Sequence, residues 1–125
     1  MRNFRELVIW KESKEIAKSI YKLSALLPKD ELYGLKSQIQ KSSVSISSNI
    51  AEGCSRSSDL DFKRFLEMAL GSTFELETQL IIIEETGLVS NEKLIEIFNN
   101  ISLLQKRLNS FISHLKSSIY PKANT

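Results

Sequence analysis

Apolar residues recur every three or four positions along most of the 125-residue chain, which is the spacing of amphipathic helices. The pattern is clearest near the end of the chain and predicts a helix over about 90–118, with the apolar stripe Leu94, Ile97, Ile101, Leu104, Leu108, Phe111 and Leu115. A second stripe predicts a helix over about 59–86 and consists of Phe62, Leu66, Ala69, Thr73, Leu76, Leu80 and Ile83. Both stripes have the spacing of helices that pack in a bundle.

The first half of the chain is expected to form two further helices. The first spans about 5–26 and ends before Pro28, because proline disfavours helix at the residue that precedes it. Its apolar arc comprises Ile9, Trp10, Ile16, Ala17, Ile20, Tyr21, Leu23 and Leu27. The second spans about 32–52, with Gly53 as the residue that closes it. The apolar face of this helix comprises Leu35, Ile39, Ile46 and Ile50.

Six serines between residues 37 and 48 make the second of these helices unusual, since serine competes for backbone hydrogen bonds inside a helix. Residues 43–47 alternate serine with apolar residues, so a strand is the alternative. We favour the helix, because an isolated strand would have no partner in this chain.

The turn residues support four helices joined by short connections. Ser58 precedes Asp61 by three residues, as in a helix N-cap, and Gly87 ends the third helix. Short connections favour antiparallel neighbours. We therefore expect an all-α protein, an antiparallel up-down-up-down four-helix bundle that forms one domain over residues 1–125.

Composition places the chain among soluble globular proteins, with 42% apolar and 26% charged residues. The longest apolar run, over 80–83, is far shorter than the roughly 20 residues that span a bilayer. Charges near the amino terminus argue against a signal peptide, and a single cysteine agrees with a reducing compartment. We therefore expect a cytoplasmic protein without membrane contact.

The net charge of +2 is unevenly distributed. Residues 1–57 hold ten Lys/Arg and six Asp/Glu (+4), residues 58–87 two and seven (−5), and residues 88–125 five and two (+3). The third predicted helix is therefore acidic, whereas the rest of the chain is basic.

The sequence offers little for catalysis or metal binding. Di-iron bundles need two Glu-x-x-His motifs, and zinc sites need several Cys or His ligands, but this chain has one histidine, His114, and one cysteine, Cys54. His114 is expected at the surface or its boundary. Cys54 follows the glycine expected to close a helix, so an exposed thiol is one interpretation and an inert cysteine the other. We expect no catalytic residues, no metal and no cofactor.

Carboxylates on the third predicted helix do not form a catalytic pair. Glu75 and Glu77 point about 200° apart on a helix, so they cannot share one site. Glu75 and Gln79 instead meet on one flank next to Ser72, where a partly buried polar cluster would fix the register of the helices.

Two surface features are candidates for binding. A basic stripe on the first predicted helix consists of Lys11, Lys14, Lys18 and Lys22. It indicates either a solvated face or contact with nucleic-acid phosphates. A second apolar line on the third predicted helix consists of Leu70, Phe74 and Ile81. This line indicates either an oligomer interface or a wider contact with the core.

Several segments resemble the four-helix bundle protein family, also named 23S rRNA-intervening-sequence protein or S23 ribosomal protein. The segments are residues 4–11, 31–38, 44–53, 62–66 and 69–80. The residues that match the family's motifs are Trp10, Tyr33, Gly34, Leu35, Gln38, Ser45, Asn49, Glu52, Gly53, Phe65, Gly71, Ser72, Glu75 and Gln79.

The resemblance implies an antiparallel bundle that assembles as a homopentamer, often encoded within bacterial 23S ribosomal RNA genes. A related branch serves as accessory factor to the reverse transcriptase of diversity-generating retroelements, where a basic pentamer binds nucleic acid. We therefore expect a non-catalytic homo-oligomer that acts as a scaffold or as an accessory protein on RNA or DNA. The alternative is a protein-interaction module with no nucleic-acid role.

Overall fold

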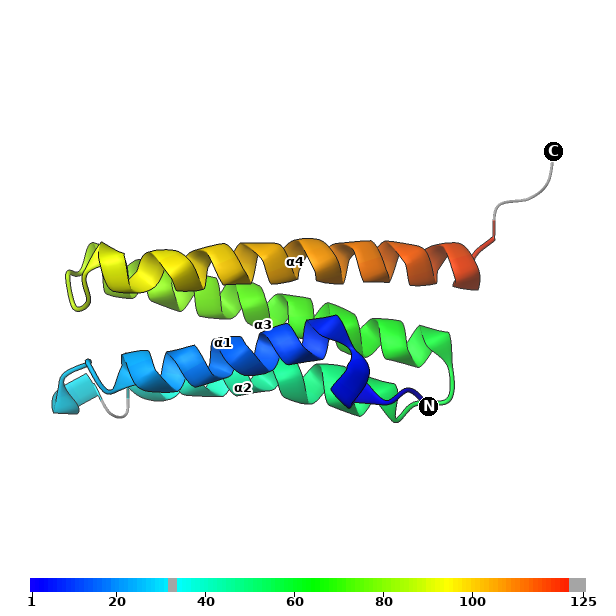
Figure 1. Ribbon diagram of the computed structural model, residues 1–125, viewed down its shortest axis with the longest axis horizontal. Helices are drawn as coiled ribbons and strands as arrows, with labels where there is room; N and C mark the ends of the chain where they lie inside the picture. Colours follow the sequence, from blue (N-terminus) through cyan, green and yellow to red (C-terminus); the bar gives the residue numbers. More distant parts are fainter. Residues whose placement is uncertain (32–33, 122–125) are drawn as a thin grey trace.

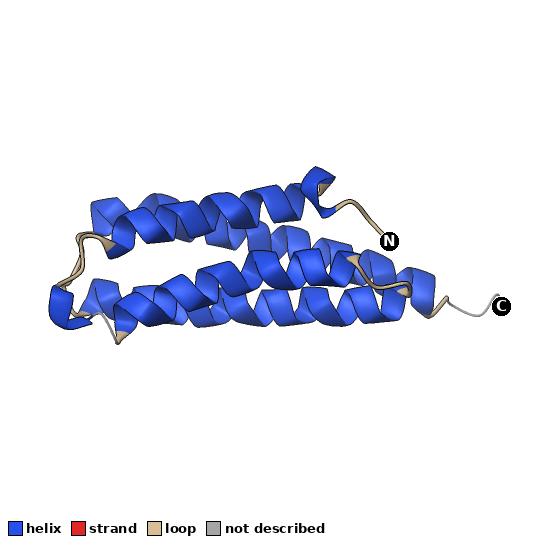
Figure 2. Ribbon diagram, turned by 90° about the horizontal axis from the view of Figure 1, so that it is seen from below, coloured by secondary structure: helices blue, strands red, loops and turns tan. Residues whose placement is uncertain are grey.

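The computed structural model describes residues 1–31 and 34–121, and this part of the chain contains four α-helices and no strand (Figures 1 and 2). The helices are α1 (Val8–Ser24), α2 (Leu35–Cys54), α3 (Asp59–Glu85) and α4 (Asn91–Ile119). Consecutive helices lie side by side and run in opposite directions (Figure 1). The predicted all-α, up-down-up-down four-helix bundle is therefore confirmed.

The chain starts differently from the expected helix over about 5–26. A short 3-10 helix, η1 (Phe4–Glu6), precedes α1, and the Asn3 side chain caps it by accepting a bond from the Arg5 backbone N–H. Leu7 then has an extended backbone, with φ −76° and ψ 129°. Because η1 is capped locally and Leu7 is extended, α1 begins only at Val8. A second 3-10 helix, η2 (Lys29–Glu31), follows α1.

The core is built from the predicted stripes, with differences at their edges. All seven stripe residues of α3 are buried. In α4, Phe111 is only half-buried and Ile112 is buried instead. In α1, Tyr21 is exposed, because it lies at the edge of an arc that is wider than the contact with α2 and α4. Half-buried residues at such edges are Trp10, Ala17 and Leu35.

The strand alternative for residues 43–47 is wrong, since these residues are helical. Serine hydroxyls inside α2 bond to carbonyls one turn back: Ser42 to Gln38 O at 2.8 Å, and Ser43 to Gln40 O at 3.0 Å. These bonds satisfy the buried hydroxyls without ending the helix.

The helix ends agree only in part with those expected from the sequence. The Ser58 side chain accepts a bond from the Asp61 N–H at 3.1 Å, which confirms the N-cap of α3. Gly87 has φ +74° and follows the end of α3, as expected. Gly53 does not close α2, because the helix continues through Cys54 and Gly53 is buried inside it. None of the four helices combines the length and apolar character that crossing a membrane requires.

Candidate functional site

A polar network joins α2 to α3, where the sequence predicted a cluster of Glu75 and Gln79. Ser42 Oγ lies 2.8 Å from Gln79 Oε1 and 3.2 Å from Glu75 Oε1, and its single proton is shared among these two oxygens and Gln38 O. Gln79 Nε2 donates to Glu75 Oε1 at 3.3 Å. Ser42 and Gln79 are buried and Glu75 is exposed, so the network leads from the core to the surface. Such a network fixes the register of two helices, because shifting either helix would leave buried polar groups unpaired.

Ser72 was expected next to Glu75 and Gln79 but pairs elsewhere. Its hydroxyl lies 2.9 Å from the Ser45 hydroxyl, and Asn49 Nδ2 donates to the Ser45 carbonyl at 2.9 Å. On α3, Ser72 lies one helical turn before Glu75, and on α2, Ser45 lies one turn after Ser42. Because the two helices are antiparallel, these two turns face each other. The two sets of contacts therefore continue one another along the α2–α3 seam.

Glu75 and Glu77 belong to different seams, as their spacing predicted. Glu77 accepts a bond from Gln105 of α4 at 3.1 Å, whereas Glu75 faces α2. No shared carboxylate site exists between these two residues.

The four lysines of the basic stripe are all exposed on α1. Lys18 pairs with Glu15 at 3.4 Å, and the Lys14 ammonium lies 5.2 Å from the centroid of the Trp10 ring. Lys11 and Lys22 form no ion pair with the described residues. The positive charge of this face is therefore only partly neutralised within the chain.

The second apolar line on α3 divides into two parts. Leu70 is half-buried and packs against the core, which matches the alternative of a wider core contact. Phe74 and Ile81 remain 52% and 40% exposed. The exposed part of the line is thus Phe74 and Ile81, and we use "α3 line" for these two residues.

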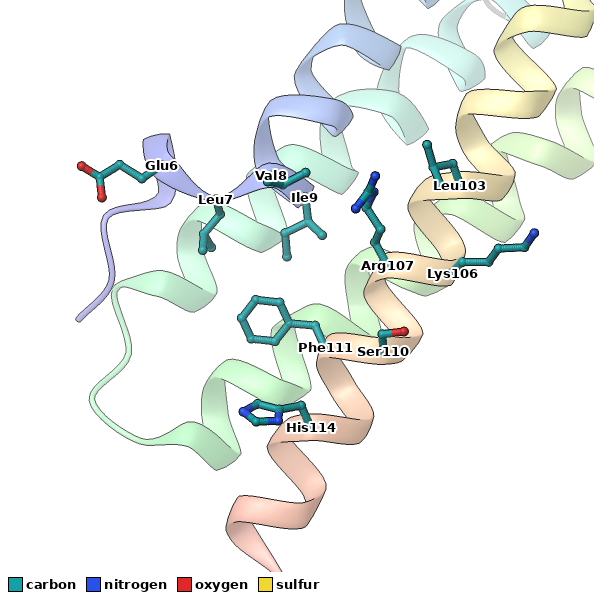
Figure 3. A pocket seen from close by; sticks show the side chains of 10 residues that line it. All are labelled: Glu6, Leu7, Val8, Ile9, Leu103, Lys106, Arg107, Ser110, Phe111 and His114. Carbon is teal, nitrogen blue, oxygen red and sulfur yellow. The ribbon is translucent and has the colours of Figure 1, made fainter.

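A hollow of about 710 Å³ opens between the start of α1 and the second half of α4 (Figure 3). Figure 3 shows Leu7, Ile9 and Phe111 pointing into the space between the two segments. Val8 and Leu103 are 53% and 43% exposed on its two lips. The polar lining residues are Glu6, Lys106, Arg107, Ser110 and His114.

Two smaller hollows, of about 250 and 290 Å³, continue along the same α1–α4 seam. The seam is bridged by an ion pair in which Arg107 Nε lies 3.1 Å from both carboxylate oxygens of Glu12. One of these oxygens, Oε1, is buried and has no hydrogen bond within the described part of the chain. We use "α1–α4 groove" for the large hollow alone, which residues 6–9 line on one side and residues of α4 from Leu103 to His114 line on the other.

The α1–α4 groove is not visible in the sequence. Glu12 and Arg107 are 95 residues apart, so no local spacing relates them. The available signal was the presence of apolar Val8 and Leu103 outside the predicted stripes, on helix faces that are otherwise polar.

Cys54 is 1% exposed, so the interpretation of an exposed thiol is wrong. The Arg2 backbone N–H donates to the Cys54 carbonyl at 3.0 Å, and the Arg2 guanidinium lies 4.2 Å from the centroid of the Phe62 ring. The amino-terminal segment therefore covers the end of α2. Burial raises the pKa of the Cys54 thiol, and the positive charges of Arg2 and the amino terminus partly oppose that shift.

His114 is exposed, as expected, on the edge of the large hollow. Across residues 1–31 and 34–121, no three His, Cys, Asp or Glu side chains gather in a way that would hold a metal ion.

The family-motif residues concentrate along α2 and α3. Gly34 and Leu35 lie at the start of α2, Glu52 pairs with Arg56 at 3.3 Å, and Tyr33 falls outside the described residues. The motif residues that make the α2–α3 contacts described above are Ser45, Asn49, Ser72, Glu75 and Gln79.

The fold and its surfaces define a small four-helix bundle protein with an apolar line on one helix and a groove between two others. Residues 5–110 match the family model described as 23S rRNA-intervening sequence protein. This match covers most of the chain, and the chain belongs to that family.

A solved structure supports the same assignment. It is a protein with unknown function from the S23 ribosomal protein family of Bacteroides thetaiotaomicron VPI-5482, with 30% sequence identity and a TM-score of 0.79. The alignment covers 84% of this chain and 98% of that chain. No curated protein matches the chain significantly.

Proposed function

We propose that this chain is a non-catalytic, homo-oligomeric scaffold of the cytoplasm, pentameric in form, that presents basic faces to RNA or DNA as an accessory protein. Assembly is the central part of the proposal, and nucleic-acid contact is the role that the assembled bundle would serve.

The single observation that supports assembly best is the exposure of the α3 line. Phe74 and Ile81 lie seven residues apart, so they share one face of a straight helix. Burying the exposed half of Phe74 and the exposed two-fifths of Ile81 against a partner would be favourable, at about 25 cal/mol per Å² of apolar surface. A second copy of the chain can supply the apolar surface that such a partner needs.

The lysines of α1 support the nucleic-acid part. Lys11 and Lys22 are exposed without an ion pair inside the described residues, and a ring of copies would repeat this basic face several times. Repetition matters, because several weak phosphate contacts on one strand act together.

The chemistry of the polar groups supports a role without catalysis. The buried serines of α2 bond to carbonyls one turn back, Ser42 also contacts Gln79 of α3, and the Cys54 thiol is buried with a raised pKa. The thiol is therefore uncharged at neutral pH and a poor nucleophile.

Fluorescence anisotropy with structured RNA and duplex DNA tests the nucleic-acid part. We expect binding that weakens steeply with salt, and a Lys14→Glu/Lys18→Glu double variant that binds less tightly with a salt slope smaller by at least about two. The matched control is Lys41→Glu/Lys116→Glu, which makes the same charge change at exposed lysines outside the stripe. Equal losses in the two variants would contradict a role for the stripe.

A protein-interaction module with no nucleic-acid role is the second candidate, and the α3 line is the observation that favours it. If the assembled protein binds neither RNA nor DNA at low ionic strength, this second candidate replaces the first.

A further inference from the structure

We infer that the α3 line of one copy docks into the α1–α4 groove of the next copy, so that the assembly is head-to-tail. This inference rests on the proposed self-assembly and adds which two surfaces meet.

Charge complementarity is the first argument. Helix α3 has two Lys/Arg and seven Asp/Glu, a net charge of −5, whereas α1 and α4 each have four Lys/Arg and two Asp/Glu, a net charge of +2. Packing two α3 helices against each other would bring like charges together. Packing α3 onto α1 and α4 brings opposite charges together.

The local surroundings of the two surfaces agree with these totals. Glu67, Glu77 and Glu85 lie within about 60° of the α3 line on a helical projection. Lys63 lies on the same side and pairs with Glu67 at 3.0 Å, so the excess negative charge there comes from Glu77 and Glu85. The groove lining holds Lys106 and Arg107 on the α4 side and Glu6 on the other side, a net charge of +1.

Shape is the second argument. The α1–α4 groove has an apolar floor of Leu7, Ile9 and Phe111, with exposed Val8 and Leu103 on its lips (Figure 3). A helix fits such a groove by inserting apolar residues spaced a whole number of turns apart, as Phe74 and Ile81 are. The two surfaces lie on different sides of the bundle, because α3 does not contact α1.

Symmetry follows from this arrangement. When two copies join through different surfaces, one copy still has a free α3 line and the other still has a free groove. Further copies can therefore add until the ring closes. A head-to-tail contact is therefore suited to an odd-numbered ring, whereas a contact between identical surfaces produces pairs.

The test uses two full-length variants and native mass spectrometry. Phe74→Glu disables the α3 line, and Leu103→Glu disables the groove; both residues are exposed, so folding should survive, and circular dichroism checks it. We expect each variant alone to have the mass of one 14.2 kDa chain. An equimolar mixture should form a dimer with twice that mass, because the intact α3 line of Leu103→Glu docks into the intact groove of Phe74→Glu. The dimer should not grow further, because its free α3 line and its free groove each carry a disabling substitution.

Val44→Glu is the matched control, since Val44 is also an exposed apolar residue but lies on α2, outside both surfaces. It should keep the mass of the unmodified assembly. If Leu103→Glu keeps the full assembly, or if the mixture of variants yields no dimer, the docking inference is overturned while self-assembly stands. A monomeric unmodified protein would overturn both.

Discussion

Gly53 of α2 packs so closely on Phe65 of α3 that a Cβ atom added to Gly53 would lie 2.7 Å from the Phe65 Cβ. The same atom would lie 3.1 Å from Phe62 Cδ1. Real Cβ atoms do not approach this closely, and a Cβ neighbour cannot rotate away as the end of a long side chain can. Gly53 is thus required by helix-to-helix distance and not by a turn.

Gly53→Ala is therefore expected to destabilise the bundle by about 1–2 kcal/mol, because overpacking outweighs the better helix propensity of alanine. Gly71→Ala is the control: it lies within α3 and an added Cβ meets nothing within 4 Å, so it should stabilise by about 0.5–1 kcal/mol. Urea unfolding followed by circular dichroism measures both. Equal effects at the two glycines would show that the close approach is unimportant.

The N-cap of α3 gives a second prediction. Ser58→Ala removes the side-chain acceptor of the Asp61 N–H and should cost about 1 kcal/mol of stability. Ser90 is the N-cap of α4 but makes no side-chain capping bond, so Ser90→Ala should change stability by less than about 0.5 kcal/mol. Thermal and urea unfolding measure the stability of the two variants. A larger loss of stability in Ser90→Ala than in Ser58→Ala would contradict the assignment of Ser58 as the side-chain cap.

Coupling across the α2–α3 seam can be measured with a double-mutant cycle on Ser42→Ala and Gln79→Met. Because Ser42 Oγ and Gln79 Oε1 are 2.8 Å apart in a buried setting, we expect an interaction energy of about 0.5–1.5 kcal/mol. The cycle of Ser42→Ala with Ser58→Ala is the control and should be additive within about 0.5 kcal/mol. Additivity in both cycles would mean that the network does not link the helices.

Burial of the Cys54 thiol predicts slow reaction with thiol reagents and a pH dependence of the free energy of unfolding. Its raised pKa means that the folded state favours the protonated thiol, so the associated stability is fully present below the thiol's ordinary pKa. That stability is lost as pH rises through the raised pKa of the folded state. Urea midpoints of the unmodified chain should therefore fall more steeply above about pH 8.5 than those of Cys54→Ala.

A thiol reagent should also react much more slowly with the native protein than with protein in urea. Equal rates in the two states, or parallel pH profiles for the unmodified chain and Cys54→Ala, would contradict this account of Cys54.

Much of the fold follows from the sequence because helix periodicity is a local property. The stripe from Phe62 to Ile83 could be read directly, since each residue depends only on its neighbours three and four positions away. Phe111 and Ile112 show the limit: both lie near the edge of a stripe, and only the position of α1 and the amino-terminal segment decides which one is buried.

The interaction surfaces were harder to predict, because they depend on distances between helices. Gly53 looked like a helix end, since the sequence does not reveal that Phe65 lies against it. The α1–α4 groove needs Leu7 and Phe111 to converge from opposite ends of the chain. The exposed α3 line was visible in the sequence, but its separation from Leu70, which packs on the core, required the structure.

Self-assembly is the claim on which the proposed function depends most directly. Native mass spectrometry of the unmodified protein at micromolar concentration measures it in one experiment. We predict a closed assembly with five times the 14.2 kDa chain mass. A single species with the mass of one chain would contradict the account.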